Sequence, residues 1–526
     1  MLEFEPYHIH TSYSNCLTQP DSTMSIEDYA KVYKERGHHV LCISEHGNRS
    51  NVWQQFELAK KYSDDTFKMT PLAAAEVYFV PDRKVEIEGK KDNRNFHLIL
   101  VAKNMEGFYQ LNEILSEANL TGYYYHARVD YDLLGKLNPK DFICTTACVG
   151  GIWKDPDYEQ YALQLCEIFR DSFYLEIQHH PQQIQVETNQ KILKLYQKYK
   201  WPLIYGTDSH YVFKEEKELR RELLLSSGIT YGQEDEFLLH LPTAEEAMQM
   251  FHQQGVFSTS RIEEAMENTL ILREFEGINF TNEKKIPNSH PELPMDRRNF
   301  LFKKTVCNEY IQKSGMPSPE EAAEIHKEMD MITETGTTDY FLIMKEIVER
   351  GIQYGGVLTK TGRGSGASFS TNYSLGFSSI NRLHCPVKMY PERFISKDRL
   401  VNGLPDLDLN MANVPAFERA GKEILGEFGC LPMIAYGTVK TLSAFKLLAR
   451  ARDLDFETSN EISKQIKNYE MDVKHAIENN ADDPDYDVSD DVHIENYIDE
   501  KYLSLIEASK QYRGIVTTLV PQVGAA

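Results

Sequence analysis

The sequence lacks the marks of a membrane or secreted protein. No apolar run reaches the roughly 20 residues that a transmembrane helix requires, and the first residues, Met1–Glu5, do not resemble a signal peptide. The 8 cysteines are scattered, and none belongs to a Cys-x-x-Cys pair. Scattered cysteines are typical of free thiols in a reducing compartment. We therefore expect a cytoplasmic protein with no membrane partner.

An excess of positive charge is also absent. The chain holds 57 Lys and Arg against 80 Asp and Glu, a net charge of −23. This excludes a generally basic coat for nucleic acid but not a locally basic channel. Residues 471–500 carry 11 of the acids and a single Lys, which indicates a solvated or disordered loop. With 526 residues, the chain is long enough for several domains.

The first 280 residues alternate short apolar runs with amphipathic helical patterns. Between the first two runs, Ser25 and Asp28 form a capping-box signature, and Gly37 is a C-cap candidate, so a helix is expected between them. Alternating strands and helices predict a parallel α/β barrel, with chemistry at the carboxyl ends of the strands. The expected strands are Tyr7–His10, Val40–Ser44, Ala73–Phe79, His97–Ala102, Phe142–Thr146, Phe173–Ile177 and Leu203–Thr207.

Side chains of the metal-ligand type gather at the ends of these expected strands. His8 and His10 are two residues apart, so on a strand their imidazoles share one face, and Asp208 with His210 repeats the spacing. A single histidine would indicate a core residue, but imidazole, carboxylate and thiolate together favour a cluster of Zn²⁺ or Mn²⁺ ions. The residues at these ends are His8, His10, Glu45, His46, Glu76, His97, Cys148, Asp208 and His210.

A second pattern spans residues 362–410. The glycine-rich run 362–366 (GRGSG) lies between an apolar run and a helical pattern, where backbone N–H groups can approach phosphate oxygens, and Arg363 adds a forked donor. On an expected strand over 404–410, Asp406 and Asp408 share one face and could hold Mg²⁺. Each half alone also fits a simpler alternative, a plain loop for the first and a solvated strand edge for the second.

Together the two patterns carry a family resemblance. Residues 362–368 (GRGSGAS), 392–399 (ERFISKDR) and 405–408 (PDLD) resemble, in order and spacing, the palm of the bacterial C-family replicative DNA polymerases of the DNA polymerase III alpha type. Residues 8–14 (HIHTSYS), 44–48 (SEHGN) and 208–210 (DSH) resemble the PHP (polymerase and histidinol phosphatase) domain at the N-terminus of the same proteins. The resemblance implies a distorted (β/α)7 PHP barrel, then a nucleotidyltransferase-type α+β palm and a helical thumb.

The resemblance also implies a ligand set and an activity. Family members with proofreading activity bind three metal ions through nine ligands, and eight of these map directly onto His8, His10, His46, Glu76, His97, Cys148, Asp208 and His210. Leu17 stands at the ungapped position of the ninth, but the loop after His10 is longer than in typical members, so Asp21 takes the place. Beside Pro20, Asp21 also fits a turn-forming residue. The implied activity is a metal-dependent 3′–5′ exonuclease.

For the rest of the chain the resemblance implies a polymerase. Asp406 and Asp408 would bind Mg²⁺, while Arg363, Gly364, Ser365 and Arg393 would hold the triphosphate of a dNTP. The implied domains are the PHP domain over 1–285, the first part of the palm over 286–432, the thumb over 433–510 and the start of a returning palm segment over 511–526. The implied partners are primer–template DNA, dNTPs, a sliding clamp and other replisome proteins.

Other parts of the family fall beyond residue 526. These are a third catalytic Asp, the fingers, the clamp-binding part and the OB-fold, so we expect a fragment, a split subunit or a truncated product from a bacterium or a phage-infected cell. Such a chain would extend no primer without a second chain. Two alternatives stay open. The first is a free-standing PHP phosphoesterase that acts on small phosphate esters, which leaves the palm pattern unexplained. The second is an inactive DNA-binding or assembly remnant, which the atypical run 518–523 (TLVPQV) favours.

Overall fold

The protein divides into two compact units. The computed structural model describes residues 2–16, 19–87, 90–281, 286–359, 361–396, 398–399, 403–427, 429–431, 433–480, 487–488 and 491–521. The first unit combines Met1–Phe280 with Ala435–Val520, and the second combines Thr281–Ile434 with Pro521–Ala526. The second unit is thus inserted into the chain of the first. Leu17, residues 481–486 and 489–490 of the acidic stretch 471–500, and residues 522–526 lie outside the described residues. The start of that stretch is helical as far as Asn479, so the expectation of a loop is wrong there.

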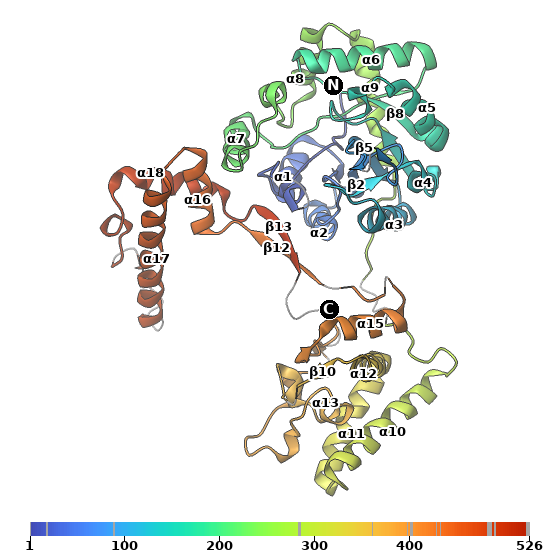
Figure 1. Cartoon of the computed structure of the whole chain (residues 1–526), viewed down its shortest axis with the longest axis vertical. Coiled ribbons are helices and arrows are strands. Elements are labelled where there is room, and N and C mark those ends of the chain that lie inside the picture. Colours follow the sequence, from blue (N-terminus) through green and yellow to red (C-terminus); the bar gives the residue numbers. More distant parts are fainter. Residues whose placement is uncertain are drawn as a thin grey trace. The chain divides into compact units, whose positions relative to one another are not determined.

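A curled sheet forms the middle of the first unit (Figure 1). Within the described part of the chain it has seven strands, in the order β1-β2-β5-β7-β8-β9, with β6 paired to β2. Their bounds are β1 (Val40–Ile43), β2 (Thr70–Phe79), β5 (Phe96–Ala102), β6 (Arg128–Val129), β7 (Phe142–Thr145), β8 (Phe173–Ile177) and β9 (Leu203–Tyr205). A small separate hairpin joins β3 (Glu86–Ile87) to β4 (Lys90–Lys91).

The strand β5 runs against both of its neighbours. It pairs antiparallel with β2 and with β7, whereas β1 with β2, β7 with β8, and β8 with β9 are parallel pairs. The expectation of a wholly parallel barrel is therefore wrong at this strand. The short hairpin β3–β4, rather than a crossover helix, connects β2 to β5, and such a connection reverses the chain. His97, near the start of β5, consequently lies at the same edge as the carboxyl ends of β1, β2, β8 and β9.

The segment Tyr7–His10 closes the barrel without forming the strand expected from the sequence. Ile9 makes an isolated parallel bridge to Ser209, beyond the end of β9. His10 N donates to Ser209 O at 2.8 Å, and on the other side Ser44 N donates to Ile9 O at 2.9 Å. The segment therefore joins the extensions of the two edge strands, β9 and β1.

Alternate residues of each strand face the barrel interior or the surrounding helices. Leu72 and Ala74 of β2 and Ile99 and Val101 of β5 belong to a buried interior cluster that also includes Cys42 and Ile204. The residues between them belong to a larger cluster that the strands form with the helices. Because side chains alternate along a strand, this pattern defines which positions look inward at the end of the barrel where the polar residues lie.

Helices cover the outside of the sheet (Figure 1). The first helix confirms its sequence signature: Ser25 and Asp28 form a capping box, and Gly37 adopts the left-handed conformation at the C-cap. The helices of this stretch are α1 (Ile26–Arg36), α2 (Val52–Tyr62), α3 (Met105–Thr121), α4 (Tyr131–Leu134), α5 (Tyr158–Phe169), α6 (Gln183–Tyr199), α7 (Lys217–Ser226), α8 (Ala244–Gln254) and α9 (Thr259–Glu267). Among the described residues, no helix is both long and apolar enough to span a bilayer.

The stretch 435–520 packs against the barrel through α7. Its elements are β12 (Ile434–Thr438), α16 (Thr441–Ala451), α17 (Phe456–Asn479), α18 (Glu500–Ser509) and β13 (Val516–Pro521), with β12 paired to β13. Glu222 of α7 accepts hydrogen bonds from Tyr512 Oη at 2.5 Å and Arg452 Nε at 2.8 Å. Asn15 donates to Val516 O at 2.9 Å, so β13 reaches the loop that follows the first histidines.

The second unit is mainly helical. Its elements are α10 (Met295–Ser314), α11 (Pro319–Glu334), α12 (Thr338–Gln353), β10 (Val357–Leu358), α13 (Ser370–Leu375), β11 (Met411–Ala412) and α15 (Val414–Leu425). The sequence patterns at 319–333, 340–353 and 415–428 predict helices, and a helix is present at each, although the last ends at Leu425. The expected strand over 404–410 is wrong, because the ladder with β10 begins only at Met411.

Candidate metal centre and glycine-rich turn

The inward-facing positions change from apolar to ligand-type at one end of the barrel. On β2 the inward series continues from Leu72 and Ala74 to Glu76, and on β5 it continues from Val101 and Ile99 to His97. Glu76 is paired in register with Ile99. Strand periodicity therefore directs the carboxylate and the imidazole into the same space, above an apolar floor.

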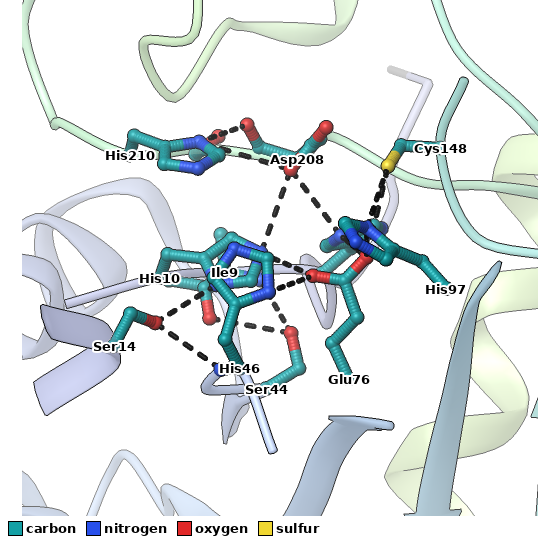
Figure 2. A network of polar contacts seen from close by, with 12 residues as sticks. Ile9, His10, Ser14, Ser44, His46, Glu76, His97, Cys148, Asp208 and His210 are labelled. Atoms are coloured by element: carbon teal, nitrogen blue, oxygen red, sulfur yellow. Dashed lines mark hydrogen bonds and ion pairs between the residues drawn. The ribbon is translucent and has the colours of Figure 1, made fainter. Parts of the chain in front are cut away.

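Glu76 lies at the centre of the cluster (Figure 2). Its Oε1 is 2.8 Å from His97 Nδ1, and its Oε2 is 3.1 Å from His10 Nε2 and 3.0 Å from His46 Nδ1. Cys148 Sγ lies 3.4 Å from His97 Nδ1 and 3.6 Å from Glu76 Oε1. One buried carboxylate thus contacts imidazoles from three separate segments of the chain.

Asp208 occupies the opposite side of the cluster, with His8 between it and Glu76. His8 Nε2 is 3.2 Å from Asp208 Oδ1 and 3.5 Å from Glu76 Oε1. His10 Nε2 also approaches Asp208 Oδ1, at 3.5 Å. Asp208 has a positive φ of 49°, which is uncommon for a residue other than glycine and marks a backbone held by its surroundings.

Asp21 forms a third corner with two histidines. Its Oδ2 is 2.7 Å from His210 Nε2 and 3.2 Å from His46 Nε2. Its Oδ1 accepts from Arg220 at 2.7 Å, and its backbone carbonyl accepts from Arg220 Nε at 2.7 Å. The structure therefore brings Asp21 together with the eight other predicted ligands. Its carboxylate contacts two of the histidines and Arg220.

The donor atoms of this cluster fit bound cations. Within the described residues, four of its buried atoms meet charged neighbours only as ion pairs and make no well-oriented hydrogen bond: Nε2 of His8, Nε2 of His10, Nδ1 of His46 and Oε2 of Glu76. Three sets of donors lie within 4.8 Å of one another, namely His10-Asp21-His46-His210, His8-His10-Glu76 and His46-Glu76-His97. Imidazole and carboxylate donors in such sets match the ligands of Zn²⁺ and Mn²⁺.

The charges of the cluster are tightly interdependent. Burial alone would lower the pKa of His8, but Glu176, Asp208 and Glu76 raise that pKa well above its usual value. Burial would raise the pKa of Glu76, but His97, His46 and His8 hold it well below its usual value. Burial, reinforced by Asp208 and Glu76, raises the pKa of the Cys148 thiol. The site is therefore arranged for positive charge at its centre, which a cation supplies.

Several supporting residues were not found from the sequence. Glu176, on β8, accepts from His8 Nδ1 at 2.6 Å, which leaves Nε2 of that imidazole facing the cluster. Arg220 holds Asp21 as described above. Asn15 Oδ1 accepts from Asp21 N at 2.6 Å. The signal for Glu176 was present, because a lone carboxylate within the apolar run 173–177 (FYLEI) must have a buried partner.

Glu45 also supports the cluster through hydrogen bonds and does not face it as a ligand would. Thr11 N donates to its Oε2 at 3.1 Å, and the Thr11 and Ser14 hydroxyls and the Asn51 amide also donate to this carboxylate. Ser14 Oγ in turn lies 3.1 Å from His10 Nδ1. Glu45 therefore fixes the orientation of His10 through Ser14, as outer partners of metal-binding histidines do.

The second predicted site is on the surface of the second unit. Gly364 has a φ of +59°, and a Cβ at this position would overlap the Asp408 carboxylate. The glycine-rich turn and the acidic run are thus in direct contact, as the sequence pairing predicts. Asp406 and Asp408 are exposed, while the alternating Leu407 and Leu409 pack against the core of the unit. Both carboxylates therefore share the exposed face.

The remaining residues predicted to bind nucleotide flank this turn. Arg363 is exposed, and Ser365 begins a short 3₁₀ helix that ends at Ser368. Arg393 is also exposed, and its neighbour Phe394 packs on Phe369 with ring centroids 5.2 Å apart. The polar groups at this site face solvent, in contrast to the buried cluster of the first unit.

Comparisons with known proteins match both halves of the chain. Residues 6–180 match the PHP domain, and residues 301–519 match the bacterial DNA polymerase III alpha NTPase domain. The DNA polymerase III subunit alpha of Borreliella burgdorferi is 26% identical over 505 residues, covering 90% of this chain and 41% of the relative. That of Aquifex aeolicus is also 26% identical, covering 88% and 41%, and that of Chlamydia pneumoniae is 25% identical, covering 91% and 42%. The chain thus spans about two fifths of the length of the curated relatives that it matches.

Proposed function

The chain carries a PHP domain and the NTPase domain of bacterial DNA polymerase III alpha, and so belongs to the DNA polymerase III alpha family; from this premise we propose that its N-terminal cluster is the active site of a metal-dependent 3′–5′ exonuclease. The observation that carries the proposal is the convergence of nine ligand-type side chains in one buried cluster, where four donor atoms make no well-oriented hydrogen bond. Such an arrangement is costly unless cations occupy it.

The ligands assigned to the cations are His8, His10, Asp21, His46, Glu76, His97, Cys148, Asp208 and His210. Bound Zn²⁺ or Mn²⁺ would supply an activated water and stabilise charge on the phosphate. The chain's own residues position these ligands. Glu176 holds His8 through Nδ1, Ser14 holds His10 through Nδ1, and Arg220 holds Asp21. Each of these contacts restricts one ligand to a single orientation, which a multi-cation site requires.

The geometry of the second unit supports a role in nucleotidyl transfer, as in the polymerases that the chain resembles. The glycine-rich turn at Gly364 contacts Asp408, and Asp406 lies on the same exposed face. Backbone N–H groups of the turn would bind dNTP phosphates, with Arg363, Ser365 and Arg393 beside them, and the two carboxylates would bind Mg²⁺. Primer–template DNA, dNTPs and other replisome proteins are the partners that this role implies. Residues 286–432 would form the first part of the palm, and residues 433–510 the thumb.

One experiment separates the two sites. The full chain, incubated with Mn²⁺ or Zn²⁺ and a 5′-labelled single-stranded DNA, should shorten it from the 3′ end. Asp208→Asn should abolish this shortening, and Asp406→Asn, which changes an exposed carboxylate in the second unit, should leave it intact. Circular dichroism would verify that both variants are folded. Loss of cleavage in Asp406→Asn alone would refute the assignment of nuclease activity to the N-terminal cluster.

A further inference from the structure

A tight aromatic turn, Tyr124–His126, lies between α3 and β6. Tyr124 N donates to His126 O at 2.9 Å, and the two residues form an isolated antiparallel bridge. Tyr125 is at the tip of this turn. Its side chain is 71% exposed and its φ is +60°. A bulky exposed ring therefore sits on a left-handed backbone, where glycine would be the less strained residue.

A series of rings connects this aromatic turn to the metal centre. Tyr78 stacks over His46 with ring centroids 6.0 Å apart, and meets His97 edge-on at 5.3 Å. On its other side, Tyr78 stacks on His126 at 4.1 Å and 23°. Tyr78 is buried, His126 is partly buried and Tyr125 is exposed. The rings thus run from two candidate metal ligands outward to the surface of the same unit.

The strained conformation of Tyr125 has no evident role in the fold. Its ring contacts Tyr124, with centroids 4.7 Å apart, but most of its surface faces solvent. A left-handed backbone at a residue other than glycine is unfavourable, and such residues concentrate at functional sites. The side chain of Tyr125 is therefore the feature that requires an explanation.

A nucleobase is the occupant that fits this surface. Aromatic side chains bind single-stranded DNA by stacking on its bases, and any base can take part because each has a π-face. The chain has a net charge of −23, so general attraction of phosphates contributes less here than in a basic protein. Base stacking supplies affinity that does not depend on that charge.

We propose that Tyr125 stacks on a nucleobase at the 3′ end of single-stranded DNA and so holds the terminal phosphodiester at the metal centre. This inference rests on the proposed exonuclease function. Tyr124 and His126 are positioning residues, since they hold the turn and link it to Tyr78. Recognition through stacking leaves the sequence of the strand unread, as an enzyme that removes any terminal nucleotide requires.

Binding to a matched pair of oligonucleotides tests this proposal. The first is a 5′-fluorescein decathymidylate with cleavage-resistant phosphorothioate linkages at its 3′ end. The second carries abasic residues in place of its last two nucleosides. Fluorescence anisotropy with the full chain in Mn²⁺ should give about tenfold weaker binding to the abasic strand. Tyr125→Gly should bind both strands equally weakly, while its melting temperature should equal or exceed that of the wild type, because the backbone strain is relieved.

Two further variants give the controls. Tyr125→Phe keeps the ring and should keep the preference for the intact strand. Tyr109→Ala removes a different exposed tyrosine, on α3, and should also keep it. The proposal is overturned if Tyr125→Gly still prefers the intact strand, or if the wild type binds both strands equally or not at all. A wild type that discriminates between the strands but cleaves no DNA would refute the proposed nuclease and leave the stacking site standing.

Discussion

Cation binding at the N-terminal cluster should depend steeply on pH, because protons and cations compete for the same nitrogen atoms. Without a cation, burial lowers the pKa of His8, but Glu176, Asp208 and Glu76 outweigh burial and raise it well above 6.5. Burial likewise lowers the pKa of His46, but Glu76 and Asp21 raise it well above 6.5. Both imidazoles are therefore protonated near neutral pH. Burial also keeps the Cys148 thiol protonated by raising its pKa, and all three groups must release their protons to bind cations.

The magnitude follows from counting those protons. Each displaced proton changes the affinity about tenfold per pH unit, or about 1.4 kcal/mol, so His8, His46 and Cys148 together give about 1,000-fold tighter binding per pH unit. The cation-free protein has the opposite dependence. Histidines with a raised folded-state pKa stabilise the fold below about pH 6.5 and lose that contribution as pH rises through the raised pKa, by up to about 2.7 kcal/mol per pH unit for two groups.

Calorimetry and thermal melting would measure both effects. Chelator-treated protein would be titrated with Mn²⁺ near pH 7 in two buffers of different ionisation enthalpy, which reports the number of protons released, expected to be at least about three. Glu176→Gln removes the carboxylate that contributes most to raising the pKa of His8 and should reduce this number by about one. His38→Gln is the matched control, because burial lowers the pKa of His38 to about 4 and it is neutral throughout. Release of no protons, or a cation-free protein that becomes more stable from about pH 6.5 to 8, would refute the reasoning.

Three further substitutions are predicted from close contacts. Gly206→Ala would push its Cβ into the Glu176 carboxylate and should lower the metal content of the protein, measured by mass spectrometry. A metal content equal to that of the wild type would contradict the role given to Glu176. In Gly364→Ala the added Cβ would overlap the Asp408 carboxylate, at a residue with a positive φ, which costs about 1–3 kcal/mol locally. This variant should weaken Mg²⁺-dependent binding of a fluorescent dNTP without changing the circular dichroism spectrum. Unchanged binding would argue against the glycine-rich turn as the nucleotide site. Ser25→Ala breaks the capping box of α1 and should lower the free energy of unfolding in urea by about 1 kcal/mol, whereas Ser25→Thr should largely preserve it.

The inward-facing positions of Glu76 and His97 could be predicted from the sequence, because they continue a period-2 pattern. Leu72, Ala74 and Glu76 share one face of a strand, and the change from apolar to acidic along that face marks where the barrel interior opens. The capping signature of α1 is equally local and is confirmed. Both signals depend only on residues that are neighbours in the chain.

Features set by distant contacts could not be predicted in the same way. The orientation of β5 depends on which strands flank it, and its apolar pattern is the same in either direction. Arg220 reads as an ordinary polar residue of a helix, and only the fold brings it to Asp21. The packing of the stretch 435–520 against α7 likewise depends on pairs such as Glu222 and Tyr512, which are far apart in sequence and carry no local signature.

The contact between Asn15 and Val516 has a consequence for how the protein forms during synthesis. Asn15 holds Asp21 in place through the backbone N–H of Asp21, yet its own side chain is completed by a carbonyl 501 positions later. At a translation rate of about 5–20 residues per second, the ribosome needs roughly 25–100 s to reach that carbonyl. In a nascent chain, the loop that carries Asn15 and Asp21 would therefore lack one of its hydrogen bonds while the inserted unit is synthesised. The loop would reach its final anchoring only near the end of translation.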